Sequence, residues 1–450
     1  MSNSQQRRSI FSGLLLIFLG TLFLIFRFDP SLHLGTLIWR FWPVLIILWG
    51  LAKLFDHLAA RRSGERTTVL SGGEAALLIL VIFCLAGLGV ADRIRKRHPN
   101  FDFRFDPFAE KYTRSDELPA QKVAAGSHIT IETPRGSISV HVGDGSDLRV
   151  TVNKSAADSS ESAADRRMDA TKAVIEATSD GFSVHPTGVG DEGGAVTVNL
   201  DVEVPKGAQV TATTEHGDIS VAGLGGAVDV GTSDGDVDIH DTASDVNARM
   251  AKGDLRVANV AGSVRVNGRG NGIDVSDVGG DATLDGEFFG PIRVRNVAKT
   301  THFVSQRSDL TLVKMTGRME MDSGDLEISD VAGGVKLLTH NKDMDVENVA
   351  GPLEIVDSHG DIKIRFAQPP TNAVNVTNDS GEVSLTLPGE SGFEISAMTK
   401  GGDVSTEFEG SGLQQTNDEN VGKLAGKYGS HGPKITIATS YGTISLHKRS

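Results

Sequence analysis

Gly217-Asp218-Ile219, Gly235-Asp236-Val237 and Gly253-Asp254-Leu255 decide the fold, because the same kind of tripeptide recurs at a constant short spacing. The repeat continues at nearly the same spacing, at Gly272, Gly290, Ser308, Gly324, Lys342 and Gly360. A fixed short period is typical of a solenoid, in which each repeat is one coil stacked on the previous one. The sequence therefore predicts eight consecutive coils of similar length.

A second landmark lies half a coil further on, as in Asn259-Val260-Ala261-Gly262. In each half coil two apolar residues stand two apart, such as Leu255 and Val257, which places both on the same side of a strand. Equivalent residues of successive coils would stack about 4.8 Å apart. One such column holds Val260, Val278, Val297, Met315, Val331 and Val349. The pattern predicts an all-β fold, a parallel β-solenoid with about 18 residues per coil.

The composition agrees with this fold and excludes other classes. The chain holds 52 glycines but only 6% aromatic residues, which suits short strands that turn at glycine corners. The single cysteine, Cys84, excludes disulfide scaffolds and cysteine-built zinc sites. Residues 1–100 hold 12 Lys and Arg against 5 Asp and Glu, whereas residues 101–450 hold 32 against 53. The acidic body argues against a nucleic-acid partner, because phosphate binding needs clustered basic side chains.

The regions around the repeat are expected to be a linker and two caps. Residues 98–126 hold three prolines among mixed charges and are expected to form a linker. Residues 127–207 alternate as strands and form the N-terminal cap, with one short helix expected within Ser159–Thr178. The solenoid occupies 208–408, and its last coils are slightly longer, from Gly360 to Gly381 and Gly402. Residues 409–450 are expected to be a loop up to 433, followed by closing strands.

Residues 1–97 are predicted to be an α-helical, multi-pass transmembrane anchor. Apolar runs extend over Ile10–Phe26, Leu34–Phe55 and Ala75–Ala91, and each approaches the length needed to cross a bilayer core of about 30 Å. No small-residue cleavage site follows the first run, so a cleaved signal peptide is the weaker interpretation.

The side of the membrane that carries the body is less well defined by the sequence. Three spans with an inner N-terminus place the body outside the cytoplasm, and this arrangement is favoured. The basic cluster Arg93–Arg97 then breaks the positive-inside rule. A re-entrant run, or a hairpin followed by a surface segment, would place the body inside.

Two stretches resemble known bacterial families. Trp39-Arg40-Phe41-Trp42-Pro43 and the aliphatic run up to Trp49-Gly50-Leu51 resemble the transmembrane module of LiaI/LiaF-type cell-envelope stress proteins, which covers roughly positions 1–60. Residues 129–447 resemble the bacterial "putative adhesin" domain built from Gly-Asp-Ile repeats, through Gly136-Ser137-Ile138, Val204-Pro205-Lys206-Gly207 and Gly360-Asp361-Ile362. The resemblance implies a membrane-anchored envelope protein, in a family without an assigned activity.

Two motifs match catalytic patterns but lack the required context. Gly188-x-Gly190-x-x-Gly193 fits a dinucleotide fingerprint, yet a strand is expected to follow it where a helix is needed. Gly231-Thr232-Ser233-Asp234-Gly235 fits the nucleophile elbow of hydrolases, yet here it is a corner between strands. We therefore assign no catalytic residue, no cofactor-binding residue and no cofactor.

The corner aspartates are the remaining candidates for a binding site. Asp218, Asp236, Asp254, Asp309, Asp325, Asp343 and Asp361 would form one row. Either each carboxylate accepts a backbone N–H within its own turn, which we favour, or the row binds Ca²⁺ between coils. His340 and His359 fall at neighbouring corners and are best interpreted as exposed turn residues, because no third ligand is in register. No metal site is assigned.

The sequence favours a non-enzymatic, membrane-anchored interaction module over two alternatives. Its expected partners are the lipid bilayer and an unknown protein or glycan, in an adhesion-like or envelope-stress accessory role. A carbohydrate-active β-helix enzyme would need catalytic loops, and the coils between residues 217 and 366 have almost no insertions. A self-assembling cell-envelope scaffold would need uncapped solenoid ends.

Overall fold

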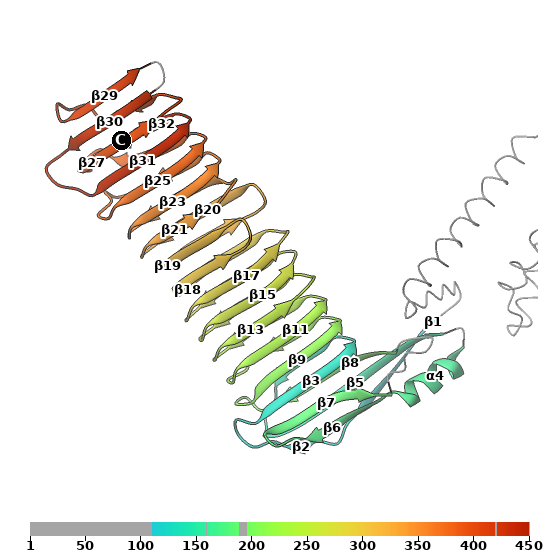
Figure 1. Ribbon diagram of the computed structural model, residues 1–450. Helices are drawn as coiled ribbons and strands as arrows, with labels where there is room; N and C mark the ends of the chain where they lie inside the picture. Colours follow the sequence, from blue (N-terminus) through green and yellow to red (C-terminus); the bar gives the residue numbers. More distant parts are fainter. Residues whose placement is uncertain (1–109, 159, 189–195, 419–420, 450) are drawn as a thin grey trace, which may run out of the picture. The chain divides into compact units, whose positions relative to one another are not determined.

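Inward-facing Val, Ile and Leu residues build two ladders of short strands in the computed structural model, which describes residues 110–449 except 159, 189–195 and 419–420. Each turn of the chain, here called a rung, contributes one strand to each ladder (Figure 1). Ladder A comprises β4 (Ile138–Val142), β10 (Ile219–Ala222), β12 (Val237–Thr242), β14 (Leu255–Val260), β16 (Ile273–Val278), β20 (Asp325–Val331), β22 (Asp343–Val349), β24 (Ile362–Arg365) and β26 (Val383–Pro388). Ladder B comprises β3 (His128–Arg135), β9 (Gln209–His216), β11 (Val228–Asp234), β13 (Val246–Met250), β15 (Val264–Gly270), β17 (Ala282–Phe288), β21 (Val335–Leu338), β23 (Leu353–His359) and β25 (Val374–Ser380).

The register of the parallel pairs confirms the predicted solenoid. Val237 pairs with Leu255, and Leu255 pairs with Ile273, so each partner lies one predicted coil further along the sequence. The residues two positions further on, Val257 and Val275, are completely buried. Each rung thus adds small aliphatic side chains to one continuous core between the two ladders, and burying each of them contributes about 1.5–3 kcal/mol relative to exposure.

One rung runs in the opposite direction, which the sequence did not predict. β18 (Ile292–Val304) crosses both ladders, the chain turns at residues 305–308, and β19 (Asp309–Met321) returns antiparallel to it. A second turn then leads into β20, which is antiparallel to β19. Ser308 and Asp309 therefore do not occupy the corner position expected for them, because they lie where the chain reverses.

The reversed rung nevertheless preserves the predicted core column. Met315 pairs with Val297 on one side and with Val331 on the other. All six residues of the expected column are at most 3% exposed, namely Val260, Val278, Val297, Met315, Val331 and Val349. The periodicity therefore located the inward residues correctly, although the strand direction was wrong.

The solenoid begins one rung earlier in the sequence than expected, within the segment predicted to form the N-terminal cap. β3 and β4 pair in parallel with β9 and β10, with Ile138 beside Ile219, so residues 128–142 form a solenoid rung within the expected cap. On their other side lie β7 (Gly181–Thr187) and β8 (Thr197–Val204), also parallel. β5 (Asp147–Asp158) then runs antiparallel along β8, and β6 (Lys172–Ala177) runs antiparallel along β7.

Two further elements of the cap differ from the sequence prediction. The expected linker 98–126 contains β1 (Glu110–Glu117) and β2 (Gln121–Lys122), both antiparallel to β5. β1 carries polar side chains on both faces, so its sequence lacks the alternation of apolar and polar residues by which a strand is predicted. The expected helix is present as α4 (Glu161–Ala170), which packs on β5, but the end of the segment assigned to it is strand β6.

The C-terminal cap also corrects the expected order. β31 (Lys434–Tyr441) and β32 (Ile444–Arg449) insert in parallel between the rung of β25 and β26 and the rung of β27 (Phe393–Thr399) and β28 (Val404–Thr406). The region expected as a loop forms a hairpin of β29 (Leu413–Asp418) and β30 (Val421–Tyr428), with β30 antiparallel to β27. The aromatic rings of Phe393, Phe408 and Tyr428 lie 5.0–5.4 Å apart between centroids and close this end of the core.

Polar side chains of the hairpin complete the C-terminal closure. Asn417 accepts a hydrogen bond from the Val404 backbone N–H, and Asn417 and Gln415 both donate to the Val404 carbonyl. These side chains take the place of a further strand on β28 and cover an edge that would otherwise invite strand addition.

The predicted transmembrane anchor lies outside the described residues. Among residues 110–449, as far as they are described, no helix has the length and apolar character to cross a membrane.

Candidate functional site: the corners and outward faces of the solenoid

The corner aspartates accept backbone hydrogen bonds from the next rung. Oδ1 of Asp218 accepts the Asp236 N–H at 2.9 Å, and Oδ1 of Asp236 accepts the Asp254 N–H at 2.8 Å. The same bond joins Asp254 to Gly272, Asp343 to Asp361 and Asp361 to Glu382. The expectation of a bond within each residue's own turn was therefore wrong in detail. The carboxylates connect successive rungs at a point where the strand ladder has no carbonyl to offer.

Glycine precedes four of these aspartates, Asp218, Asp236, Asp254 and Asp361, because the corner backbones of adjacent rungs almost touch. A Cβ on Gly253, whose φ is +108°, would lie 2.1 Å from the Gly235 carbonyl oxygen. Only glycine combines this conformation with so close an approach. The Gly-Asp pair is thus explained by the geometry of the corner, without a ligand.

The row stops at Asp254, because Gly272 and Pro291 occupy the aspartate position of the next two rungs, and the reversed rung follows them. Asp309 lies at the start of β19, and its carboxylate is 3.2 Å from Nε2 of His302. The row resumes at Asp325, which pairs in register with Asp343. A continuous line of carboxylates, as a cation array between all coils would require, is therefore not formed.

A second row lies at the ends of the ladder A strands of the middle rungs, from β12 to β22, and the sequence analysis missed it. Asp241, Asn259, Asp277, Asn296, Lys314, Asp330 and Asn348 all have φ between 51° and 58°. Asn and Asp tolerate this left-handed conformation better than other residues with a side chain. The signal was present as the Asn or Asp that opens the second landmark of each coil.

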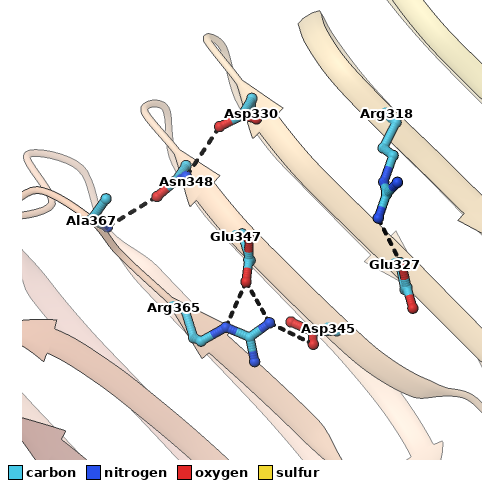
Figure 2. Close-up of polar contacts among 8 residues, drawn as sticks. All are labelled: Arg318, Glu327, Asp330, Asp345, Glu347, Asn348, Arg365 and Ala367. Carbon is cyan, nitrogen blue, oxygen red and sulfur yellow. Dashed lines mark hydrogen bonds and ion pairs between the residues drawn. The ribbon is translucent and has the colours of Figure 1, made fainter. Parts of the chain in front are cut away.

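The side chains of this second row bond to one another along the solenoid. Amide groups of asparagine donate to aspartate on the preceding rung, as from Asn348 to Asp330 at 3.1 Å (Figure 2). Asn348 in turn accepts the backbone N–H of Ala367. Hydrogen bonds from His240 and Asn259 hold the pKa of Asp241 below its ordinary value. These groups stabilise the corners, and their polar atoms are used within the chain.

The outward face of ladder A carries paired charges. Arg365 donates from Nε to Glu347 at 2.6 Å and from Nη2 to Asp345 at 2.7 Å, so that one guanidinium joins two carboxylates (Figure 2). Arg318 reaches Glu327 across the antiparallel pair at 3.4 Å. Exposed pairs of this kind contribute little stability, typically below about 1 kcal/mol each. They do give the face a defined pattern of alternating charge.

Two shallow grooves follow the solenoid surface. One, of about 580 Å³, runs beside ladder B and includes Thr211, Asp229, Asn247, Arg265, Thr283 and His302 in its lining. The other, of about 640 Å³, follows the Gly-Asp corner and includes Asp218, Asp236, Asp238, Asp254, Arg256 and Arg293. Both are open and lined mostly by polar side chains, which fits contact with an extended partner better than enclosure of a small molecule.

The motifs with a catalytic pattern are not brought together with a catalytic partner. Ser233 is exposed near the end of β11, just before the corner that leads to β12. Gly188 is followed by β8, a strand, and the rest of that glycine motif falls outside the described residues. His340 and His359 are both exposed, and Nδ1 of His340 lies 3.2 Å from the Arg307 carbonyl oxygen. Among the described residues, no group of three or more His, Cys, Asp or Glu could hold a metal ion.

These features define a capped, two-ladder β-solenoid that displays polar faces. The chain belongs to the Toastrack DUF4097 family, whose sequence profile matches residues 127–447. A second profile, for the LiaF transmembrane domain, matches residues 11–96 and suggests a membrane protein. No curated protein matches the chain.

Solved structures with some similarity include three bacterial proteins. A protein described as a putative cell adhesion protein from Clostridium sporogenes is 10% identical with a TM-score of 0.17, over 76% of this chain and 100% of that one. Putative adhesins from Bacteroides fragilis (12% identity, TM-score 0.20, 75% and 97% covered) and Parabacteroides merdae (10%, 0.17, 74% and 95%) follow. At these TM-scores the similarity supports no functional argument.

Proposed function

We propose that this protein is a non-enzymatic, membrane-anchored interaction module with an adhesion-like or envelope-stress accessory role. In this proposal residues 1–97 form a multi-pass anchor in the bacterial cytoplasmic membrane. The solenoid lies outside the cytoplasm and presents its outward faces to a protein or glycan partner. One observation carries the proposal: the same chain matches the LiaF transmembrane domain and contains a β-solenoid of the Toastrack DUF4097 family.

The polar groups of the solenoid support a binding role over catalysis. The corner carboxylates accept backbone N–H groups, and the outward arginines pair with carboxylates of neighbouring rungs. A glycosidase needs two carboxyl groups that flank a substrate in a shaped groove. The corners between residues 217 and 366 are short and supply no such walls.

The capped ends likewise support a tethered module over a self-assembling scaffold. At the C-terminal end the ring cluster of Phe393, Phe408 and Tyr428 covers the core, and the β29–β30 hairpin covers β27. At the N-terminal end β5 covers β8. Stacking of solenoids end to end would require these elements to leave their places.

Site-specific photocrosslinking of the full-length protein in cells tests the proposal. A photoreactive phenylalanine analogue would replace Arg256 on the outward face of ladder A or Lys336 on that of ladder B. Arg166, exposed on α4, is the matched control position. We expect an adduct with a protein or glycan from one ladder face, well above the control. Adducts no stronger than at Arg166 would contradict the proposal, as would a polysaccharide-cleaving activity lost in Asp236→Ala or Asp254→Ala.

A further inference from the structure

A buried polar column runs along the inner side of ladder B and of its parallel continuation in β31 and β27. It occupies the last inward position of each strand before the Gly-Asp corner. Its members in the first and last rungs are Thr133, Thr214, Thr232, Thr339, Asp357, Asn378, Thr439 and Thr399, all at most 5% exposed. Seven of these eight side chains are neutral, and only Asp357 can carry a charge.

Four of the seven neutral members, namely Thr214, Thr232, Asn378 and Thr399, donate a hydrogen bond to the corner carbonyl of the neighbouring rung. Thr339 donates to Asp357 instead, and the Thr439 hydroxyl has no partner among the described residues. The Thr214 hydroxyl donates to Gly136 at 3.0 Å and the Thr232 hydroxyl to Gly217 at 3.1 Å. Near the C-terminal end, the amide of Asn378 donates to the Gly360 carbonyl at 2.8 Å. The Thr399 hydroxyl donates in the same way to the Gly442 carbonyl. The position therefore calls for a donor, which an ionised carboxylate cannot be.

Asp357 departs from the column in a way that points to a missing proton. Its Oδ1 accepts the Thr339 hydroxyl at 2.7 Å, while its Oδ2 is buried with no hydrogen-bond partner among the described residues. Asn378 is in register with Asp357 on the next rung, and its Oδ1 is also buried and unpartnered. Two oxygens on adjacent rungs thus have no hydrogen-bond partner among the described residues, and each such buried group costs about 1–3 kcal/mol when unsatisfied. The Thr439 hydroxyl, in register with Asn378 on the following rung, is also buried without a partner.

We propose that Asp357 is a protonated carboxylic acid whose Oδ2–H hydrogen-bonds to Oδ1 of Asn378, which makes this part of the solenoid a pH-sensitive element. One proton satisfies both oxygens and restores a donor to the column. Loss of that proton leaves a charge between the ladders and two unpaired acceptors, so the rung of β23 and β24 loosens as pH rises.

The surroundings of Asp357 favour its neutral form. Burial raises the pKa of Asp357, and the Thr339 hydroxyl and the backbone N–H groups of Ser358, Lys342 and His359 offset this only in part. Burial also lowers the pKa of Lys342, a basic group that interacts electrostatically with Asp357, and its ammonium donates to the Asp322 carbonyl. The other titratable groups on β21, β23 and β25 and next to their ends are exposed, namely Lys336, His340, Glu354, His359 and Asp379.

The sign of the pH dependence follows from the direction of the shift. An acid whose pKa is raised in the folded state binds its proton more tightly there than in the unfolded chain. Its stabilising contribution is complete below the unfolded value, near 3.8, and is lost as pH rises towards the folded value. Within that window each pH unit shifts the unfolding equilibrium by up to about tenfold.

The test compares unfolding of the full-length protein in detergent between about pH 4 and pH 8. Asp357→Asn supplies a permanent amide donor, as Asn378 does, and Asp357→Thr supplies the hydroxyl used elsewhere in the column. Asp379→Asn, exposed on the adjacent rung, is the matched control. The infrared C=O stretching band of a carboxylic acid reports the proton directly.

We expect the wild type and Asp379→Asn to lose stability as pH rises, and Asp357→Asn to be less sensitive and at least as stable near pH 8. The carboxylic-acid band should be absent from Asp357→Asn. Equal pH profiles of wild type and Asp357→Asn, or no acid band in the wild type, would overturn the proposal. If Asp357→Asn fails to fold, the carboxylic-acid band of the wild type and the pH profile of Asp357→Thr test the proposal by the same criteria.

Discussion

Aspartate serves two different purposes in this solenoid, and the position of each residue decides which. At the exposed corner Asp236 is an acceptor for the Asp254 N–H, so it acts as a carboxylate. Inside ladder B Oδ2 of Asp357 and Oδ1 of Asn378 are both buried without a partner among the described residues, so we infer that Asp357 acts as an acid. The side chain is the same, but the corner is hydrated and the column is buried.

The corner bond predicts a measurable loss of stability in Asp236→Ala. The substitution leaves the Asp254 N–H without its acceptor, which lies at 2.8 Å in the native protein. We expect a destabilisation of about 1 kcal/mol, because water at the exposed corner replaces part of the lost bond. Urea unfolding of the full-length protein in detergent measures it.

Two variants separate the bond from the loss of charge. Asp236→Asn keeps the Oδ1 acceptor and should retain most of the stability. Asp238→Ala removes a carboxylate from the same rung that accepts no hydrogen bond among the described residues, and it should be almost neutral. Equal destabilisation by Asp236→Ala and Asp238→Ala would show that charge, and not the rung-to-rung bond, is responsible.

At the scale of elements, the reversed rung shows what periodicity can and cannot predict. Alternation of inward and outward residues reads the same in both directions along a strand. The column position of Met315 was therefore predictable, whereas the direction of β19 was not. Only the turn residues carried that information: Ser305 accepts the N–H groups of Arg307 and Ser308, and Asp322 accepts those of Gly324 and Asp325.

The turn at Asp322 should make the reversed rung sensitive to acid. The N–H groups of Asp325 and Gly324 hold the pKa of Asp322 below its ordinary value near 3.8. Its contribution is therefore complete above that value and is lost as pH falls through the lower folded value. We expect Asp322→Ala to destabilise the turn at neutral pH and to converge with the wild type in strong acid.

Amide hydrogen exchange in the segment 322–325 measures this effect. Protection of the Gly324 and Asp325 amides should fall in Asp322→Ala, while the turn at Ser305 keeps its own protection as an internal control. Ser323→Ala, in the same turn, is the matched substitution, because the Ser323 side chain forms no hydrogen bond among the described residues. Unchanged exchange in Asp322→Ala would mean that the strands alone fix the reversal.

At the scale of the whole chain, the caps were harder to predict than the solenoid between them. The insertion of β31 and β32 between earlier rungs keeps every local pattern intact, because Gly442 packs on Gly381 as any corner glycine packs on its neighbour. The sequence alone cannot distinguish that order from simple succession. The Gly-Asp row was predictable as a row, but the partner of each carboxylate depends on how the rungs stack.

The membrane topology is the prediction on which the proposed function depends most. Three predicted spans with Arg7, Arg8, Arg61 and Arg62 on the inner side would place the solenoid outside, and the acidic residues of the body do not count against this prediction. Because Cys84 is the only cysteine, a Cys84→Ser background allows single-cysteine labelling. Ser323→Cys places a thiol at an exposed turn, and Thr301→Cys places one in the core. In intact spheroplasts we expect a membrane-impermeant maleimide to label Ser323→Cys, with Thr301→Cys labelled only after denaturation. Labelling of Ser323→Cys only after lysis would put the solenoid in the cytoplasm and restrict its partners to those inside the cell.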